Sequence, residues 1–210
     1  MNFIFKTIFR LKKIKVIIVS GKGKSLAVES ISHILESNFK VKKLIKKTPN
    51  LFDILIKNVF IIETNLESEK IFKKMAELVR LSPLPILVVT HMVEILKEIK
   101  QISELAQLIP SYGFLVLNFD DKSAVKINDT ANLKDITFGF EQGADFMASD
   151  VNTDNEGANF KINHNGKSIP IWQDSVGKEH VYSALATSCV GTILGLNLVE
   201  ISEALKMKWK

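Results

Sequence analysis

The sequence predicts an α/β protein: a mostly parallel P-loop-type sheet flanked by helices, with a small additional antiparallel β layer. Three observations indicate this class. Short, continuously apolar segments alternate with amphipathic ones, as parallel strands covered on both faces alternate with helices. A glycine-rich loop follows the first apolar segment, and residues 135–172 switch to short β-like runs with turns.

The N-terminal segment, residues 1–14, is basic and apolar and predicts a short amphipathic helix. Phe5, Ile8, Phe9 and Lys12 recur at helical spacing. No small-residue cleavage site follows, so we do not expect a signal peptide. Two interpretations stay open: the helix packs on its own domain, or it makes a peripheral contact with a membrane surface.

Residues 15–210 are predicted to form one domain, whose first half alternates strand and helix. Residues 16–19 are β-branched and apolar, which indicates a buried strand. After the glycine loop, residues 26–35 have apolar side chains at helical spacing. Two further strands are expected at 40–45 and 58–63, and a helix at 67–80.

The alternation continues through the middle of the chain and then changes. Strands are predicted at 85–90 and 113–118, with a long helix at 93–109 between them. Within residues 135–172, His164 to Lys167 has the composition of a hairpin turn. Two last helices are expected, at 178–194 and 198–208.

Composition limits the classes of protein. Of 210 residues, 46% are apolar and 24% charged, which excludes disordered and collagen-like chains. Cys189 is the only cysteine, which excludes an intrachain disulfide and a cysteine-based zinc site and favours a reducing, cytoplasmic setting. No apolar run reaches 18 residues, so no membrane-spanning helix is predicted.

Positive charge gathers in the first part of the chain. Residues 1–47 hold 12 lysines and arginines but only two acidic residues, a net +10, whereas the whole chain carries +5. No aromatic stacking platform is interleaved with these lysines, so we do not expect nucleic acid as a partner. A solvated face or a pocket for phosphates fits the charge better.

The glycine loop is the strongest local signal for chemistry. Gly21, Lys22, Gly23, Lys24 and Ser25 lie between a predicted strand and a predicted helix. The glycines allow backbone N–H groups to face a phosphate, and the helix N-terminus favours an anion. Lys24 would reach the β- and γ-phosphates, and Ser25 would offer its hydroxyl to Mg²⁺. The alternative is a glycine turn with solvated lysines.

Polar residues follow the other predicted strands. Glu63 ends one strand, His91 follows the next, and Asn118 and Asp121 follow a third. Because parallel strands end at one edge of a sheet, these residues should share a site with the loop. Glu63 could hold Mg²⁺ or be a surface or capping acid. His91 could be a metal ligand, a hydrogen-bond partner or purely structural.

In this order, the motifs resemble the central ATPase domain of the Mur ligases, which join an amino acid or dipeptide to a UDP-muramyl precursor of the cell wall. The resemblance covers roughly residues 14–206. It rests on VIIVSGKGKSLAVESISHIL, VFIIETNLES, ILVVTH, GFLVLNFDD, ITFGF with ADFMASDV, and GKEHVYSALATSCVGTILGLNLVEISEALK. The basic start and the ITFG segment look most like the branch that adds D-alanyl-D-alanine.

The resemblance implies an ATP- and Mg²⁺-dependent carboxylate–amine ligase that acts through an acyl phosphate in peptidoglycan precursor synthesis. It implies that Lys24 binds the ATP phosphates as the catalytic lysine. Ser25 and Glu63 would hold Mg²⁺, and His91 would help at a second metal.

Three further positions follow from the same resemblance. Asn118 and Asp121 would lie near the nucleotide. His180 stands where the family has an asparagine that contacts adenine, and Glu179 replaces the family's histidine.

The chain also departs from the family. The loop is one residue shorter, and Ile102 stands near the position of the family's carbamylated lysine, for which Lys97 or Lys100 could substitute only with a shift in register. The family's N- and C-terminal domains are expected to be missing, so a UDP-muramyl peptide reaction would need them in trans. The alternatives are a degenerate nucleotide-binding or scaffold protein without ligase activity and, less favoured, another kind of P-loop NTPase.

Overall fold

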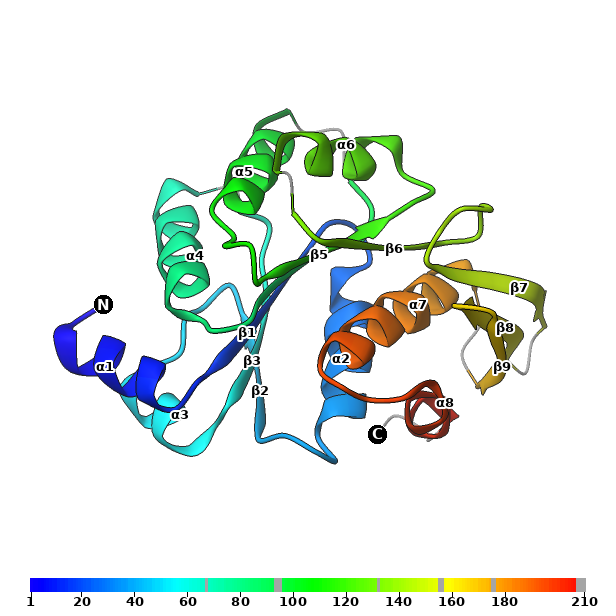
Figure 1. Ribbon diagram of the computed structural model, residues 1–210, viewed down its shortest axis with the longest axis horizontal. Coiled ribbons are helices and arrows are strands. Elements are labelled where there is room, and N and C mark those ends of the chain that lie inside the picture. Colours follow the sequence, from blue (N-terminus) through cyan, green and yellow to red (C-terminus); the bar gives the residue numbers. More distant parts are fainter. Residues whose placement is uncertain (67, 93–95, 132, 155–156, 175–176, 207–210) are drawn as a thin grey trace.

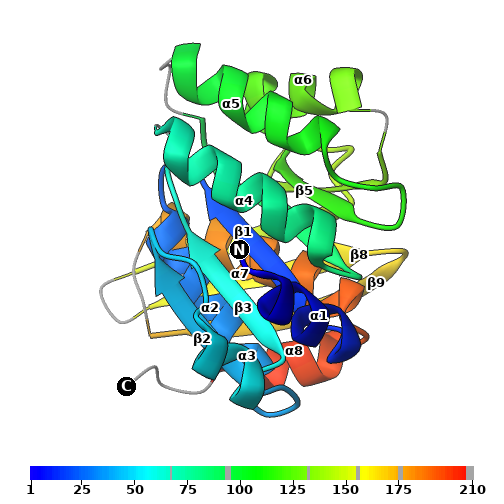
Figure 2. The same cartoon turned by 90° about the vertical axis from the view of Figure 1, so that its left-hand side faces the viewer.

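The computed structural model describes residues 1–66, 68–92, 96–131, 133–154, 157–174 and 177–206. Within these residues one nine-stranded sheet crosses the molecule in the order β2-β3-β1-β4-β5-β6-β7-β8-β9, and helices cover both of its faces (Figures 1 and 2). This arrangement confirms the predicted α/β class with a mostly parallel sheet.

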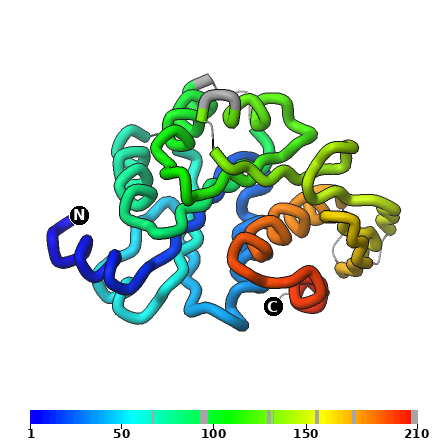
Figure 3. The backbone as a smooth tube through the Cα atoms, viewed as in Figure 1, coloured from blue at the N-terminus to red at the C-terminus, as the bar shows by residue number. Residues whose placement is uncertain are grey.

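The helices and strands follow one another along the chain as Figure 3 traces it. In chain order they are α1 (Phe3–Leu11), β1 (Lys15–Ser20), α2 (Lys24–Leu35), β2 (Val41–Ile45), α3 (Leu51–Ile56), β3 (Val59–Glu63), α4 (Glu69–Leu81), β4 (Pro85–Val89), α5 (Leu96–Gln107), β5 (Phe114–Asn118), α6 (Lys122–Ala131), β6 (Asp135–Gly139), β7 (Phe146–Thr153), β8 (Ala158–His164), β9 (Lys167–Gln173), α7 (Lys178–Ile193) and α8 (Leu198–Lys206).

The sheet changes from parallel to antiparallel at β7. All strand pairs from β2 to β7 are parallel, whereas β7, β8 and β9 pair antiparallel. The β6–β7 join is short, with only Phe138 opposite Phe146 and Gly139 opposite Met147. The predicted antiparallel strands are therefore present, but they extend the same sheet.

Alternate residues of the central strands point into two separate cores. In β1, Ile17 and Val19 pack with α2, α7 and α8, whereas Val16 and Ile18 pack with α1 and α3–α6. This double burial explains why the strands read as continuous apolar runs. Cys189 of α7 is fully buried in the first core, and this burial raises the pKa of its thiol.

Several boundaries differ from the sequence prediction. Helix α4 begins at Glu69; the expected starts at residues 67 and 93 and the expected end at 208 lie outside the described residues. The short helix α3 and helix α6 were not predicted. Helix α1 packs on its own domain through Phe5 and Phe9, and none of the described helices is long and apolar enough to cross a membrane.

Helix α3 is held by a capping box. The Asn50 side chain accepts from the Asp53 N–H at 2.8 Å, and the Asp53 carboxylate accepts from the Asn50 N–H at 3.0 Å and from the Lys42 ammonium. Burial alone would raise the pKa of Asp53, but these two donors outweigh it and lower the pKa below its usual value.

We expect Asp53→Asn to lower the free energy of unfolding by about 1 kcal/mol at pH 7. Because the pKa of Asp53 is lowered on folding, its stabilisation is present above the unfolded pKa near 4 and is lost as the pH falls through the folded value. The difference between variant and wild type should therefore shrink at pH 3. Urea unfolding at pH 7 and pH 3 measures the difference in free energy of unfolding between Asp53→Asn and wild type. Asp135→Asn, at an exposed residue, is the control. A difference that is the same at both pH values would contradict this account.

Candidate functional site

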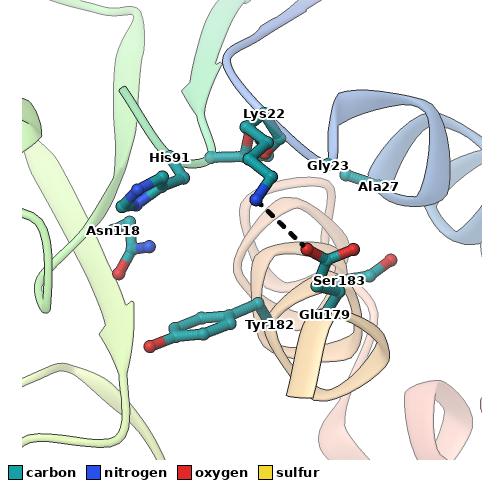
Figure 4. Close-up of a pocket in the computed structure, with 9 residues that line it drawn as sticks. Lys22, Gly23, Ala27, His91, Asn118, Glu179, Tyr182 and Ser183 are labelled. Carbon is teal, nitrogen blue, oxygen red and sulfur yellow. Dashed lines mark hydrogen bonds and ion pairs between the residues drawn. The ribbon is translucent and has the colours of Figure 1, made fainter. Parts of the chain in front are cut away.

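The carboxyl ends of β1, β4 and β5 and the first turns of α2 and α7 enclose a cavity of about 220 Å³ (Figure 4). Of the polar residues predicted from the strand ends, His91 and Asn118 line this cavity and Asp121 lies against His91, whereas Glu63 is not among the lining residues. The cavity is lined by Lys22, Gly23, Ala27, Thr90, His91, Asn118, Glu179, Tyr182 and Ser183.

The glycine loop is fastened to the end of β4. Gly21 has φ +105°, and a Cβ there would lie 2.7 Å from both the His91 carbonyl oxygen and the Thr90 hydroxyl, so only glycine fits. The Lys22 N–H donates to the His91 carbonyl at 2.7 Å. The Thr90 hydroxyl lies 3.1 Å from the Ser20 carbonyl and 2.7 Å from the Lys22 carbonyl.

The loop ends at an uncapped helix N-terminus. Gly23 is the N-cap of α2, with φ +81°, and no side chain caps the first turn. The first N–H groups of a helix have no partner within the helix, and together with the helix dipole they favour an anion. The Lys24 ammonium lies beside this turn, 3.3 Å from the Gly21 carbonyl oxygen to which it donates.

The predicted metal ligands form two separate pairs. Ser25 Oγ donates to Glu63 Oε1 at 2.9 Å, across the neighbouring strands β1 and β3. His91 Nδ1 lies 3.2 Å from Asp121 Oδ2, beyond β4 on the other side of β1. Among the described residues no three His, Cys, Asp or Glu side chains gather. Hydroxyl and carboxylate oxygens suit Mg²⁺, so the Ser25–Glu63 pair fits that ion.

Asp121 and Asn118 lie behind and beside His91. Asp121 also accepts from the Met92 N–H at 2.6 Å and from the Ser123 N–H at 2.9 Å, so it joins the end of β4 to the start of α6. Asn118 is buried on the cavity wall. Asp121 therefore holds His91 in place, and Asn118 presents a polar group to the cavity.

Helix α7 contributes a face that the sequence analysis missed. Glu179, Tyr182 and Ser183 line the cavity, as residues at i, i+3 and i+4 share one side of a helix. The predicted His180 lies on the same turn but is not among the lining residues. The helical spacing from Glu179 could have found this face, had its orientation been known.

An ion pair and a buried hydroxyl mark the α7 side of the cavity. Lys22 Nζ lies 3.8 Å from Glu179 Oε1, and the pair crosses from the glycine loop to α7 (Figure 4). Ser183 Oγ is buried and has no hydrogen-bond partner among the residues that the structure describes. A buried hydroxyl without a partner indicates a place where a ligand or water would bind.

Tyr182 anchors α7 to the end of β5. Its hydroxyl donates to Asp120 Oδ2 at 2.7 Å, and its ring meets Phe140 edge-on at 4.7 Å between centroids. Burial, and then the hydrogen bond to Asp120, raise the pKa of Tyr182 well above its usual value near 10.

We expect the free energy of unfolding of Tyr182→Phe to fall less than that of wild type as the pH rises above about 10. Since the pKa of Tyr182 is raised on folding, the unfolded chain ionises first, and wild type should lose stability as the pH rises above about 10. Urea unfolding between pH 9 and 11 checks this, and Tyr112→Phe, at a side chain 52% exposed, is the control. Equal slopes for Tyr182→Phe and wild type would contradict the prediction.

A core residue, Ile102, stands near the place where the resemblance puts the family's modified lysine. Ile102 is fully buried, whereas Lys97 and Lys100 are exposed on α5. The buried polar residue of this helix is Glu98, whose Oε1 lies 3.4 Å from Ser20 Oγ. No shift of register therefore brings Lys97 or Lys100 to the buried side of the helix.

Residues 90–191 match the sequence profile of the Mur ligase middle domain. About half of this chain is therefore similar to a Mur ligase middle domain. The profile match starts at Thr90, after the glycine loop. The Mur ligase relatives by sequence include the UDP-N-acetylmuramate–L-alanine ligases of Caldanaerobacter subterraneus, 32% identical over 47% of this chain and 22% of that protein, and of Sulfurihydrogenibium, 35% identical over 47% and 21%.

Solved Mur ligase structures share the fold over nearly the whole chain. The UDP-N-acetylmuramoylalanyl-D-glutamyl-2,6-diaminopimelate–D-alanyl-D-alanyl ligase of Acinetobacter baumannii has a TM-score of 0.76 at 18% identity, covering 96% of this chain and 48% of that one. MurF of Thermotoga maritima, solved with ADP, has a TM-score of 0.69 at 14% identity, covering 96% and 52%. The chain thus matches about a fifth of the length of its sequence relatives and about half of these structures.

Proposed function

We propose that this chain is the ATP-binding domain of a Mur-type carboxylate–amine ligase in peptidoglycan precursor synthesis. The observation that carries the proposal is the placement of the Ser25–Glu63 oxygen pair, at 2.9 Å, against the uncapped N-terminus of α2 and the glycine loop. Together they offer N–H groups, an ammonium and hard oxygen ligands to one polyphosphate.

The loop and the first turn of α2 would hold the phosphates. The Lys24 ammonium would leave the Gly21 carbonyl and pair with a phosphate oxygen instead. Ser25 and Glu63 would hold Mg²⁺, which supplies charge neutralisation for phosphoryl transfer to a carboxylate. The residues act by positioning and by electrostatic stabilisation.

The cavity would hold another part of the nucleotide. At about 220 Å³ it is smaller than a site for a whole drug-sized ligand. Asn118 and the unpartnered Ser183 hydroxyl offer it polar contacts. Asp121 would act through His91, which it orients for a second metal. Contact of His180 with adenine remains a prediction.

The wider assignments are part of the same proposal. Residues 15–210 would be the ATPase-like domain, with residues 1–14 as an appended helix. The carboxylate of a UDP-muramyl peptide would accept the phosphoryl group, with the remaining ligase domains supplied in trans.

A degenerate nucleotide-binding or scaffold protein is the second candidate. Two observations favour it: Lys24 is bonded within its own loop, and the buried Ile102 stands near the position of the family's modified lysine. Such a protein would bind nucleotide without transferring phosphate.

Calorimetric titration with ATP and Mg²⁺ tests the phosphate site. We expect Lys24→Ala to weaken binding at least tenfold, because it removes a charge-assisted contact of about 1.5–3 kcal/mol. Lys70→Ala, at an exposed lysine of α4, should bind like wild type. If wild type binds no nucleotide, both candidate functions fail.

Phosphate release separates the two candidates. A ligase domain should release phosphate from ATP when a UDP-muramyl peptide and its amine substrate are added together with the N- and C-terminal domains of a Mur ligase. Binding of ATP without any release under those conditions would favour the scaffold.

A further inference from the structure

Helices α1 and α3 leave a group of large apolar side chains exposed on one surface. On α1, Phe3 is 81% and Leu11 78% exposed; on α3, Phe52 is 67% exposed. We define the α1/α3 surface by the exposed apolar residues of both helices: Phe3, Ile4, Leu11, Leu51, Phe52, Leu55 and Ile56. Apolar groups of this extent are rarely left exposed on soluble proteins without a binding role.

The two helices lie side by side and are fixed by other residues. The Lys12 ammonium donates to the Leu55 carbonyl, which joins the end of α1 to α3. Phe5 and Phe9 of α1 and Ile54 of α3 are already buried in the core. The exposed side chains are therefore additional to those that hold the two neighbouring helices on the sheet; Figure 2 shows α1 and α3 next to each other.

The charges around this surface are positive. Arg10, Lys12 and Lys13 are exposed at the end of α1, and the half-buried Lys57 follows α3. The acidic residues of the first 57 are few: Asp53 is buried beside Lys42, and Glu29 and Glu36 belong to α2 and its C-cap on the other face of the sheet. Glu77 of α4 is paired with Lys6 and the N-terminus.

We propose that the α1/α3 surface binds an anionic lipid bilayer. Its apolar side chains would enter the boundary between headgroups and acyl chains, while the lysines and Arg10 contact lipid phosphates. The abundance of lysine favours a bilayer over a protein partner, because protein interfaces are depleted in lysine. The surface lies at the amino end of β1, whereas the glycine loop follows its carboxyl end, so nucleotide binding and lipid binding are separable.

Co-sedimentation with vesicles tests the apolar contribution. Wild type should bind phosphatidylcholine vesicles containing phosphatidylglycerol and bind pure phosphatidylcholine far less. The double variant Phe3→Ser with Phe52→Ser should lose at least tenfold in vesicle affinity. Val199→Ser, at a side chain 57% exposed on α8, should bind as wild type does. Thermal unfolding and ATP titration verify that each variant is folded.

Charge reversal tests the electrostatic contribution. Arg10→Glu with Lys13→Glu should weaken binding to the anionic vesicles by more than about tenfold, since each basic residue near an anionic surface contributes roughly fivefold. Lys167→Glu, on the β8–β9 hairpin, is the control. Raising the salt concentration should weaken wild-type binding as well.

Four results would overturn the proposal. One is vesicle binding by wild type that is unchanged in the Phe3→Ser with Phe52→Ser variant. Another is equal binding to neutral and anionic vesicles. The third is no vesicle binding together with a dimer, by light scattering, that the same double variant dissociates; that result would assign the surface to self-association. Absence of both vesicle binding and dimer would also refute it.

Discussion

Asp120→Ala is expected to lower the free energy of unfolding by about 3 kcal/mol. The Asp120 carboxylate accepts three hydrogen bonds, from the Phe140 N–H at 2.8 Å, the Glu141 N–H at 3.0 Å and the Tyr182 hydroxyl at 2.7 Å. It thereby joins the end of β5 to the β6–β7 loop and to α7. Removing it leaves two part-buried donors unpaired, the Phe140 N–H and the Tyr182 hydroxyl, and each costs about 1–3 kcal/mol, whereas the Glu141 N–H is exposed to water.

Urea unfolding at pH 7 measures this effect. Asp120→Asn keeps one oxygen acceptor and should lose less stability than Asp120→Ala. Asp135→Ala, at the exposed first residue of β6, should change stability by less than about 0.5 kcal/mol. If Asp120→Ala and Asp135→Ala were equally stable, water would be replacing the three contacts without loss.

Gly21→Ala is expected to destabilise the fold by about 2–3 kcal/mol and to abolish nucleotide binding. A left-handed backbone alone costs an alanine about 1–2 kcal/mol. At Gly21, with φ +105°, the new Cβ would also lie 2.7 Å from the His91 carbonyl oxygen and the Thr90 hydroxyl. The loop must then move away from β4 and distort the N–H groups proposed to bind phosphate.

Gly195→Ala separates the two causes. Gly195 has φ +93°, but nothing lies within 4 Å of a Cβ at that position, so only the backbone strain applies. Gly21→Ala should therefore be the less stable variant in thermal unfolding, and ATP titration should show normal binding for Gly195→Ala. Equal destabilisation would mean that the loop accommodates the added methyl group.

The sequence predicted the parallel half of the fold well because those strands are buried on both faces. Residues 16–19 and 58–63 were recognisable without knowledge of their neighbours, as β1 and β3 confirm. Helix α3 was missed because its apolar side chains are mostly exposed and give no inward stripe. That β7–β9 continue the main sheet depends on contacts between distant segments, which local pattern does not encode.

The candidate site was predictable where it depends on strand ends. Ser25 follows β1 at the start of α2 and Glu63 ends β3, the neighbouring parallel strand, so they were expected to lie close together; the structure places Ser25 Oγ 2.9 Å from Glu63 Oε1. Which residues of α7 line the cavity depends on how that helix is rotated about its axis against α2. A rotation by one residue position would place His180 at the cavity in place of Glu179. Only packing determines that rotation.

The burial of Cys189 within α7 makes the rate of thiol labelling a measure of local opening at this helix. As its only thiol, enclosed between helices and sheet, it can meet an alkylating reagent only after α7 has left its place. Because α7 also forms one wall of the cavity, the rate of labelling in the native state reports how often that wall opens, and a ligand that bridges α2 and α7 must slow it.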